Sequence, residues 1–138
     1  MSEPGRIFFI PTPIGNRDDI TLRALATLRA VDRIACEDTR HSAPLLQHHE
    51  IQKPLVSLHE HNEQRRIPEL IASVRNGESL AVITDAGMPG ISDPGYRLIQ
   101  ACLLEDIAYE VLPGPSAVLN ALVLSLIHIS EPTRPRLI

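Results

Sequence analysis

Short apolar runs alternate with segments of helical periodicity along this chain. Each run is about four residues long and mostly aliphatic, as the strands of a buried sheet are. The run at residues 80–83 is apolar at every position, which is typical of a parallel strand covered on both faces. The pattern predicts strands at residues 7–10, 33–36, 55–58, 80–83 and 109–112.

Helical patterns fill the intervals between these runs. The clearest repeats apolar positions at i, i+3, i+4 and i+7, between a candidate N-cap at Asn62 and a candidate stop at Gly77. A second pattern sets Leu22, Leu25 and Leu28 on one side of a helix. Strands alternating with helices indicate an α/β fold built on a doubly wound, five-stranded parallel sheet. Further helices are predicted around residues 45–46, 97–104 and 118–122.

The end of the chain follows a different pattern. Beyond Leu124 the helical periodicity fades, and Pro132 and Pro135 interrupt it. This stretch is typical of translated sequencing-adapter DNA. We therefore expect an α/β domain at residues 6–124, followed by a non-native or disordered tail at residues 125–138.

Composition narrows the class of protein. The 138 residues are 43% hydrophobic, enough for one domain with one core. A net charge of −4 argues against a protein that coats nucleic acid by charge alone, although a local basic patch stays open. Cys36 and Cys102 lie in apolar stretches and predict buried, reduced thiols. With no signal pattern and no apolar run of about 20 residues, we expect a cytoplasmic protein without a membrane span.

Glycine, proline and acidic residues gather where each predicted strand ends. In a parallel sheet these positions share the carboxyl edge, where open α/β sheets bind ligands. The glycine-rich loop at residues 84–95 is long for a connection of about 2–6 residues, and its glycines let backbone approach a ligand closely. The chain has neither the Gly-x-Gly-x-x-Gly fingerprint nor a P-loop. The strand-end loops are residues 11–16, 37–41, 59–63, 84–95 and 113–117.

With these loops laid out, the chain resembles the tetrapyrrole-methylase fold family, and within it the branch that methylates ribosomal RNA. The likeness runs from about Ile7 to Leu124 and rests on several motifs in a fixed order. The matching stretches are residues 11–16, 19–25, 37–41, 58–63, 85–87, 91–97 and 113–117.

The resemblance implies a methyltransferase that uses S-adenosyl-L-methionine. It implies two α/β domains with the methyl donor between them, of which this chain would be the N-terminal one and the C-terminal domain would be missing. It also implies a homodimer that methylates the ribose 2′-hydroxyl of a cytidine in small-subunit ribosomal RNA. Met88 and Gly90 depart from the family's usual residues. The donor contacts carried over are Pro13, Ile14, Gly15, Ala86, Gly87, Met88, Ile91, Ser116 and Ala117.

Transfer of a methyl group to a ribose hydroxyl needs positioning and a group that accepts the hydroxyl proton. Asp85 is our first candidate, because it leaves the buried strand at residues 80–83 and enters the glycine-rich loop. Each acid also has a structural interpretation; Asp38, for example, could cap a helix through Thr39 and Arg40. The other candidates are Glu37, Asp38, His41 and Asp93.

Basic side chains lie in or just after the second and third loops. Arg40, His41, Arg65 and Arg66 are our candidates for binding RNA phosphates, which would fix register rather than sequence. A solvated helix face explains Arg65 and Arg66 equally well.

Two other functions stay open. A methyltransferase of tetrapyrroles would use the same fold. A metal-dependent hydrolase would draw ligands from His59, His61, His41, Glu37 and Asp38, and a metal retained after dialysis would favour it.

Overall fold

The computed structural model describes residues 5–12, 17–83 and 93–113, and within them the chain folds as an α/β domain. The five described strands are all parallel and lie in the order β3-β2-β4-β1-β5. This confirms the doubly wound parallel sheet expected from the sequence. The strands are β1 (Ile7–Ile10), β2 (Arg33–Cys36), β3 (Leu55–Ser57), β4 (Leu80–Ile83) and β5 (Tyr109–Val111).

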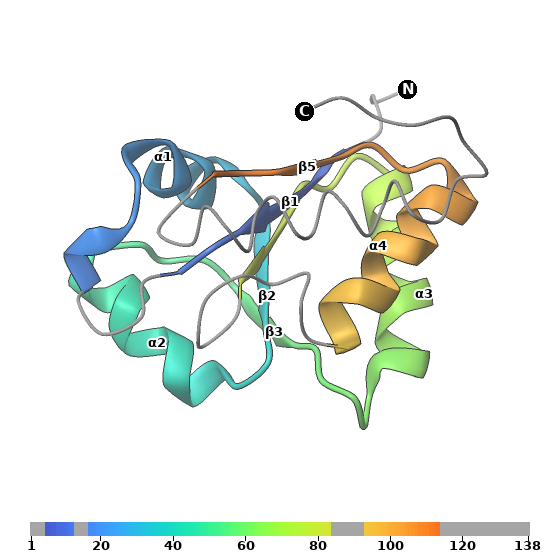
Figure 1. Ribbon diagram of the computed structural model, residues 1–138, viewed down its shortest axis with the longest axis horizontal. Coiled ribbons are helices and arrows are strands. Elements are labelled where there is room, and N and C mark those ends of the chain that lie inside the picture. Colours follow the sequence, from blue (N-terminus) through green and yellow to red (C-terminus); the bar gives the residue numbers. More distant parts are fainter. Residues whose placement is uncertain (1–4, 13–16, 84–92, 114–138) are drawn as a thin grey trace, which may run out of the picture.

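The helices cover both faces of the sheet. In Figure 1, α1 and α2 lie to the left of the strands, and α3 and α4 lie to the right. A short 3₁₀ helix, η1, precedes α1. The bounds are η1 (Arg17–Asp19), α1 (Leu22–Ala30), α2 (Thr39–His48), α3 (Glu63–Arg75) and α4 (Asp93–Glu105).

The core is split into two layers by the alternation of side chains along each strand. On β4, Leu80 and Val82 face α3 and α4, whereas Ala81 and Ile83 face α1 and α2. The same alternation separates Phe9 from Ile10 on β1. Strands buried on both faces carry near-continuous apolar runs, so the pattern that predicted them has a direct physical cause.

The end of α3 lies where the sequence predicted it, and the burial of α1 differs along the side that its leucines share. Gly77 has φ 104, a left-handed backbone that glycine adopts without strain, and it follows the last residues of α3 as predicted. On α1, however, the buried residues are Ala24 and Leu28, and Leu22 is 85% exposed. The shared side that the periodicity assigned to Leu22, Leu25 and Leu28 is thus only partly covered by the sheet: Leu25 packs against the core and Leu28 is buried, whereas Leu22 at the start of the helix is exposed.

Helix α4 begins four residues earlier than the sequence pattern indicated, at Asp93. Proline is compatible with the first turn of a helix, where its missing N–H has no partner to lose, so Pro94 does not delay the start. No helix among the described residues is long and apolar enough to cross a bilayer.

Candidate functional site

Three of the five predicted ligand loops leave the sheet from adjacent strands. Ile10 at the end of β1 pairs with Ile83 at the end of β4, and Phe9 pairs with Val111 of β5 on the other side. The segments that follow β4, β1 and β5 therefore start next to one another, along one half of the carboxyl edge. These are the three segments to which the family resemblance assigns the methyl donor.

The connections between strands also switch from one face of the sheet to the other between β1 and β4. The connection after β1 runs through α1 on one face, and the connection after β4 runs through α4 on the opposite face. When neighbouring parallel strands send their connections to opposite faces, a crevice opens beyond their carboxyl ends, and open α/β sheets bind ligands there. The boundary between β1 and β4 is thus the place that the topology favours for a ligand.

The expected donor contacts themselves lie outside the described residues. Of the first loop, the structure describes Pro11 and Thr12, both buried, with Thr12 at 2% exposure. The hydroxyl of Thr12 is therefore buried where the first loop begins. The expected contacts outside the described residues are Pro13, Ile14, Gly15, Ala86, Gly87, Met88, Ile91, Ser116 and Ala117, together with the candidate base Asp85.

The second loop shows what Asp38 does. Its side chain accepts a hydrogen bond from the backbone N–H of Arg40 at 2.9 Å and caps α2, as the structural interpretation of the sequence suggested. The hydrogen bonds from the Arg40 backbone and guanidinium hold the pKa of Asp38 below its ordinary value. A carboxylate with a lowered pKa is a weaker base, so Asp38 suits the cap better than proton abstraction. Glu37, beside it, is exposed.

The third loop is fastened by Asn62. This residue occupies the N-cap position of α3, as predicted, but its side chain makes no capping hydrogen bond. Instead, its amide oxygen accepts from the backbone N–H of His59 at 2.9 Å, and its amide nitrogen donates to the carbonyl oxygen of Ser57 at 3.2 Å. Asn62 therefore shapes the loop between β3 and α3 rather than the first turn of the helix.

An ion pair with a buried carboxylate joins the helices that follow the third and fourth loops. Glu63, in the first turn of α3, is 4% exposed, and its Oε1 lies 2.8 Å from Nη1 of Arg97 on α4. Its other oxygen, Oε2, and Nε of Arg66 are buried and have no hydrogen-bond partner among the residues that the structure describes. No sequence pattern indicated this contact, because an acid in a first turn is common and only the packing of α4 against α3 buries it.

The four basic candidates do not form one cluster. Arg40 and His41 lie on the first turn of α2, exposed, whereas Arg65 and Arg66 lie on the first turn of α3, on the opposite face of the sheet. Arg40 pairs with Asp38, and Arg66 reaches Glu69 at 3.9 Å. Both pairs of residues nonetheless flank the carboxyl ends of β2 and β3. This half of the carboxyl edge lies next to the segments after β4, β1 and β5, to which the family resemblance assigns the methyl donor.

The histidines of the second and third loops do not assemble as metal ligands in the described part of the chain. Nδ1 of His59 accepts the backbone N–H of His61 at 3.2 Å, and its Nε2 lies 3.3 Å from the amide nitrogen of Asn62, so both of its nitrogens are engaged within the loop. The group of potential ligands that does come together among the described residues lies elsewhere, at Asp18, His48 and His49. The ligand set expected for a hydrolase therefore finds no support in this geometry.

Both thiols are buried and neither forms a disulfide, as expected. Burial raises the pKa of Cys102 to about 12, which keeps the thiol protonated and unreactive. Neither cysteine lies at the carboxyl edge loops in a position to act as a nucleophile: Cys102 is inside α4, and Cys36 ends β2 with 1% exposure.

Curated relatives match most of the chain. The Ribosomal RNA small subunit methyltransferase I of Thermotoga maritima is 48% identical over 121 residues, which are 88% of this chain and 54% of that protein. The protein of the same name from Escherichia coli O157:H7 is 50% identical over 118 residues, which are 86% of this chain and 41% of that protein. The chain thus spans about half the length of the curated relatives that it matches.

Solved structures show the same fold. The uroporphyrin-III-C-methyltransferase of Thermus thermophilus matches with a TM-score of 0.65 and 23% identity, covering 87% of this chain and 52% of that one. A diphthine synthase matches with a TM-score of 0.66 and 14% identity, covering 86% and 48%. The family model described as Tetrapyrrole (Corrin/Porphyrin) Methylases matches residues 6–138. The chain therefore belongs to the tetrapyrrole (corrin/porphyrin) methylase family.

Proposed function

We propose that this chain is the N-terminal part of an S-adenosyl-L-methionine-dependent methyltransferase. The whole enzyme methylates the ribose 2′-hydroxyl of a cytidine in small-subunit ribosomal RNA. The observation that carries the proposal is the 48–50% identity, over about 120 residues, to relatives named Ribosomal RNA small subunit methyltransferase I. The enzyme acts in the cytoplasm as a homodimer, and the C-terminal domain supplies the other wall of the donor cleft.

The sheet topology supports a donor site in this half of the protein. The three segments that hold the proposed contacts follow β4, β1 and β5, which are adjacent, and the connections of β1 and β4 diverge between them. Glycine-rich backbone next to a topological switch point suits a nucleoside-like ligand. S-adenosyl-L-methionine supplies an electrophilic methyl group when it is bound there. Residues 13–15, 86–88, 91, 116 and 117 hold it.

The chemistry requires alignment and removal of one proton. The residues of the carboxyl edge would contribute mainly by positioning the ribose hydroxyl against the methyl group that the bound donor would supply. Asp85 accepts the hydroxyl proton as the new bond forms. Its position supports this role, because β4, which ends two residues before it, lies between β1 on the donor side and β2 on the other. Asp85 thus follows β4, the strand at which the proposed donor side of the carboxyl edge, β4, β1 and β5, meets the side formed by β2 and β3.

The RNA is bound on the side of β2 and β3. Arg40 and His41 on one face, and Arg65 and Arg66 on the other, flank the carboxyl ends of these strands. Their contacts are to phosphates, which position the RNA strand without reading its sequence. A net charge of −4 means that attraction comes from these local groups and not from the chain as a whole.

Methylation of a tetrapyrrole is the alternative within the family. The likeness to the Thermus thermophilus uroporphyrin-III-C-methyltransferase, at 23% identity, extends to the fold alone. The much higher identity to the relatives named for ribosomal RNA favours the RNA substrate.

The experiment is transfer of labelled methyl groups by the full-length protein. Small ribosomal subunits isolated from a strain that lacks the modification are the acceptor, and a uroporphyrinogen is the competing substrate. We expect label in a ribose of the RNA and none in the tetrapyrrole; label in the tetrapyrrole alone would contradict the proposed substrate. Asp85→Asn should lower kcat by at least about 100-fold, as loss of a general base does.

Asp106→Asn is the matched control for this substitution. Asp106 is exposed on the loop before β5, at the opposite edge of the sheet, and its φ of 57 is one that asparagine also accepts. The control should retain full activity. Retention of full activity by Asp85→Asn would remove that residue from the mechanism without touching the assignment of the substrate.

A further inference from the structure

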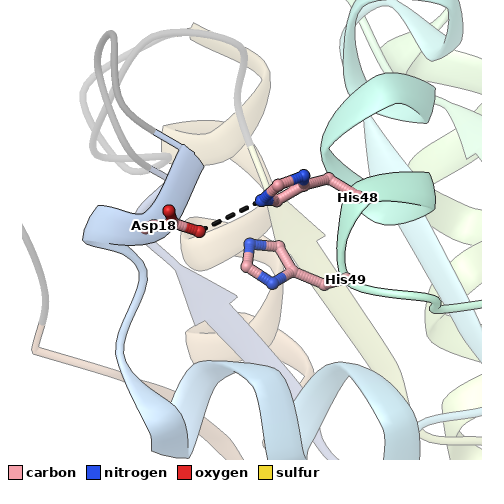
Figure 2. Close-up of side chains that lie close together, drawn as sticks. All are labelled: Asp18, His48 and His49. Atoms are coloured by element: carbon pink, nitrogen blue, oxygen red, sulfur yellow. Dashed lines mark hydrogen bonds and ion pairs between the residues drawn. The ribbon is translucent and has the colours of Figure 1, made fainter.

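Two histidines and an aspartate from separate parts of the chain meet on the surface beside α1. Asp18 belongs to η1, whereas His48 ends α2 and His49 follows it. Figure 2 shows both imidazole rings turned toward the Asp18 carboxylate. Each residue offers one ligand atom, and these atoms lie within 4.8 Å of one another.

The three side chains are already in contact. Nε2 of His48 lies 3.0 Å from Oδ1 of Asp18. The two imidazoles stack edge to face, with ring centroids 4.8 Å apart and an interplanar angle of 82°. Nε2 of His48 is directed at the carboxylate, whereas Nε2 of His49 contacts the carbonyl oxygen of Arg17, so His49 reaches a shared ion by giving up that contact or by using Nδ1.

Hydrogen bonds from three elements fix the backbone that carries these groups. The guanidinium of Arg29, at the end of α1, donates to the carbonyl oxygen of His49 at 2.9 Å. Nε2 of His49 lies 2.8 Å from the carbonyl oxygen of Arg17 in η1. The backbone N–H of His49 caps the last turn of α2. A site whose supports are formed before the ligand arrives loses less freedom when it binds.

The local field favours a cation. The C-terminal end of a helix carries a partial negative charge, and His48 and His49 lie at that end of α2. The Asp18 carboxylate adds a formal negative charge, and its side chain is 74% exposed, with that of His48 at 42%. An ion can therefore reach the ligands from solvent without any opening of the fold.

We propose that Asp18, His48 and His49 form a binding site for a divalent first-row transition metal, with Zn²⁺ as the ion it takes. Two imidazoles and one carboxylate are a donor set that Zn²⁺ accepts, whereas Mg²⁺ and Ca²⁺ take oxygen ligands. Tetrahedral coordination with metal–ligand bonds of about 2.0–2.1 Å sets ligand atoms roughly 3.3 Å apart, which the exposed side chains reach by small rotations. Water completes the coordination.

The consequence of binding is a clamp between η1 and α2. Three side chains from the two segments would share one ion, where the contact of His48 with Asp18 and that of His49 with the carbonyl oxygen of Arg17 join the segments without it. Because the ion binds the folded chain and the unfolded chain has no assembled site, binding raises the melting temperature.

The test is a competition titration of the untagged 138-residue chain with Zn²⁺ against a chromophoric chelator. We expect one Zn²⁺ per chain, and at least about tenfold weaker binding in His48→Ala and in Asp18→Asn, since loss of even an outer-shell partner costs 10–100-fold. His61→Ala is the control, because His61 is an exposed histidine that lies in another loop. Its affinity for Zn²⁺ should equal that of the unmodified chain.

Circular dichroism and a thermal scan accompany each titration. The melting temperature should rise with Zn²⁺ in the unmodified chain and in His61→Ala, and stay constant in Asp18→Asn, whose exposed side chain can be changed without loss of the fold. Co²⁺ should give the intense visible absorption of a tetrahedral site. Absence of saturable Zn²⁺ binding, or binding that His61→Ala alone removes, would overturn the proposal.

Discussion

Glu63 on α3 and Arg97 on α4 form an ion pair at the carboxyl-edge ends of their helices, with 2.8 Å between Oε1 and Nη1. A second pair, Arg75 and Glu105, joins the other ends of the same two helices at 2.6 Å. The two pairs differ in burial: the Glu63 side chain is 5% exposed, whereas those of Arg75 and Glu105 are about half exposed. The helices that follow the third and fourth loops are thus joined at both ends, and the carboxylate is buried only in the pair next to the site, although both arginines are about half exposed.

This difference predicts unequal effects of the same substitution. Arg97→Met leaves the Glu63 carboxylate buried without its partner, and should lower the free energy of unfolding by about 1–3 kcal/mol. Arg75→Met breaks an exposed pair and should cost less than about 1 kcal/mol. Urea unfolding of both variants measures the difference. Equal costs would mean that burial of Glu63 adds nothing to the pair.

The cap on α2 predicts a dependence on pH. The lowered pKa of Asp38 means that its ionised form stabilises the folded chain; this contribution is complete above the ordinary value of 3.8 and is lost as the pH falls through the lowered pKa. Asp38→Ala should therefore have a lower urea midpoint than the unmodified chain at pH 7, and the gap should narrow below 3.8. Asp38→Asn keeps a capping oxygen and should lie between them at pH 7. A gap that stays constant down to the lowest pH at which the chain folds would contradict this role.

Burial of the thiols predicts that they react only when the chain unfolds. The pKa of Cys102, raised to about 12, leaves almost no thiolate at pH 8, and reagents cannot reach either sulfur in the fold. Modification by a disulfide reagent should be slow in buffer and should accelerate in step with unfolding as urea is added. Rapid modification of the native chain would show that β2, which carries Cys36, or α4, which carries Cys102, opens far more easily than its packing indicates.

The two faces of α1 predict opposite outcomes for two leucines. Leu28 is 0% exposed in the core under the sheet, and Leu28→Ala should cost about 2–5 kcal/mol. Leu22 is 85% exposed, and Leu22→Ala should change stability by less than about 0.5 kcal/mol. Thermal or urea unfolding distinguishes them. A large cost at Leu22 would place that side chain in a contact outside the described residues.

Much of this fold follows from local sequence. The strand at residues 80–83 was predicted because both of its faces are covered, and the turn at Gly77 because its backbone needs a left-handed conformation. Periodicity set Leu22 on one side with Leu25 and Leu28, but it shows only which residues share a side and not which of them the sheet covers, so the exposure of Leu22 needed the structure.

Contacts between distant segments were beyond the reach of sequence patterns. The order β3-β2-β4-β1-β5, which sets three ligand loops side by side, depends on pairings between strands far apart in the chain. The burial of Glu63 needs α4, and the meeting of Asp18 with His48 needs η1 and α2 together. The only local sign of the latter was an adjacent pair of histidines at the end of a helical pattern. The domain bounds at residues 6–124, the tail at 125–138 and the donor contacts stay predictions.

The central claim is that a methyl-donor site lies at the carboxyl ends of β4, β1 and β5, and that it is shared with a second domain. Calorimetric titration of S-adenosylhomocysteine into this chain, beside a form extended to two domains, tests it most directly. We predict that the two-domain form binds one molecule per chain and that the 138-residue chain binds far more weakly or not at all. Absence of binding to either form would contradict the donor-site assignment.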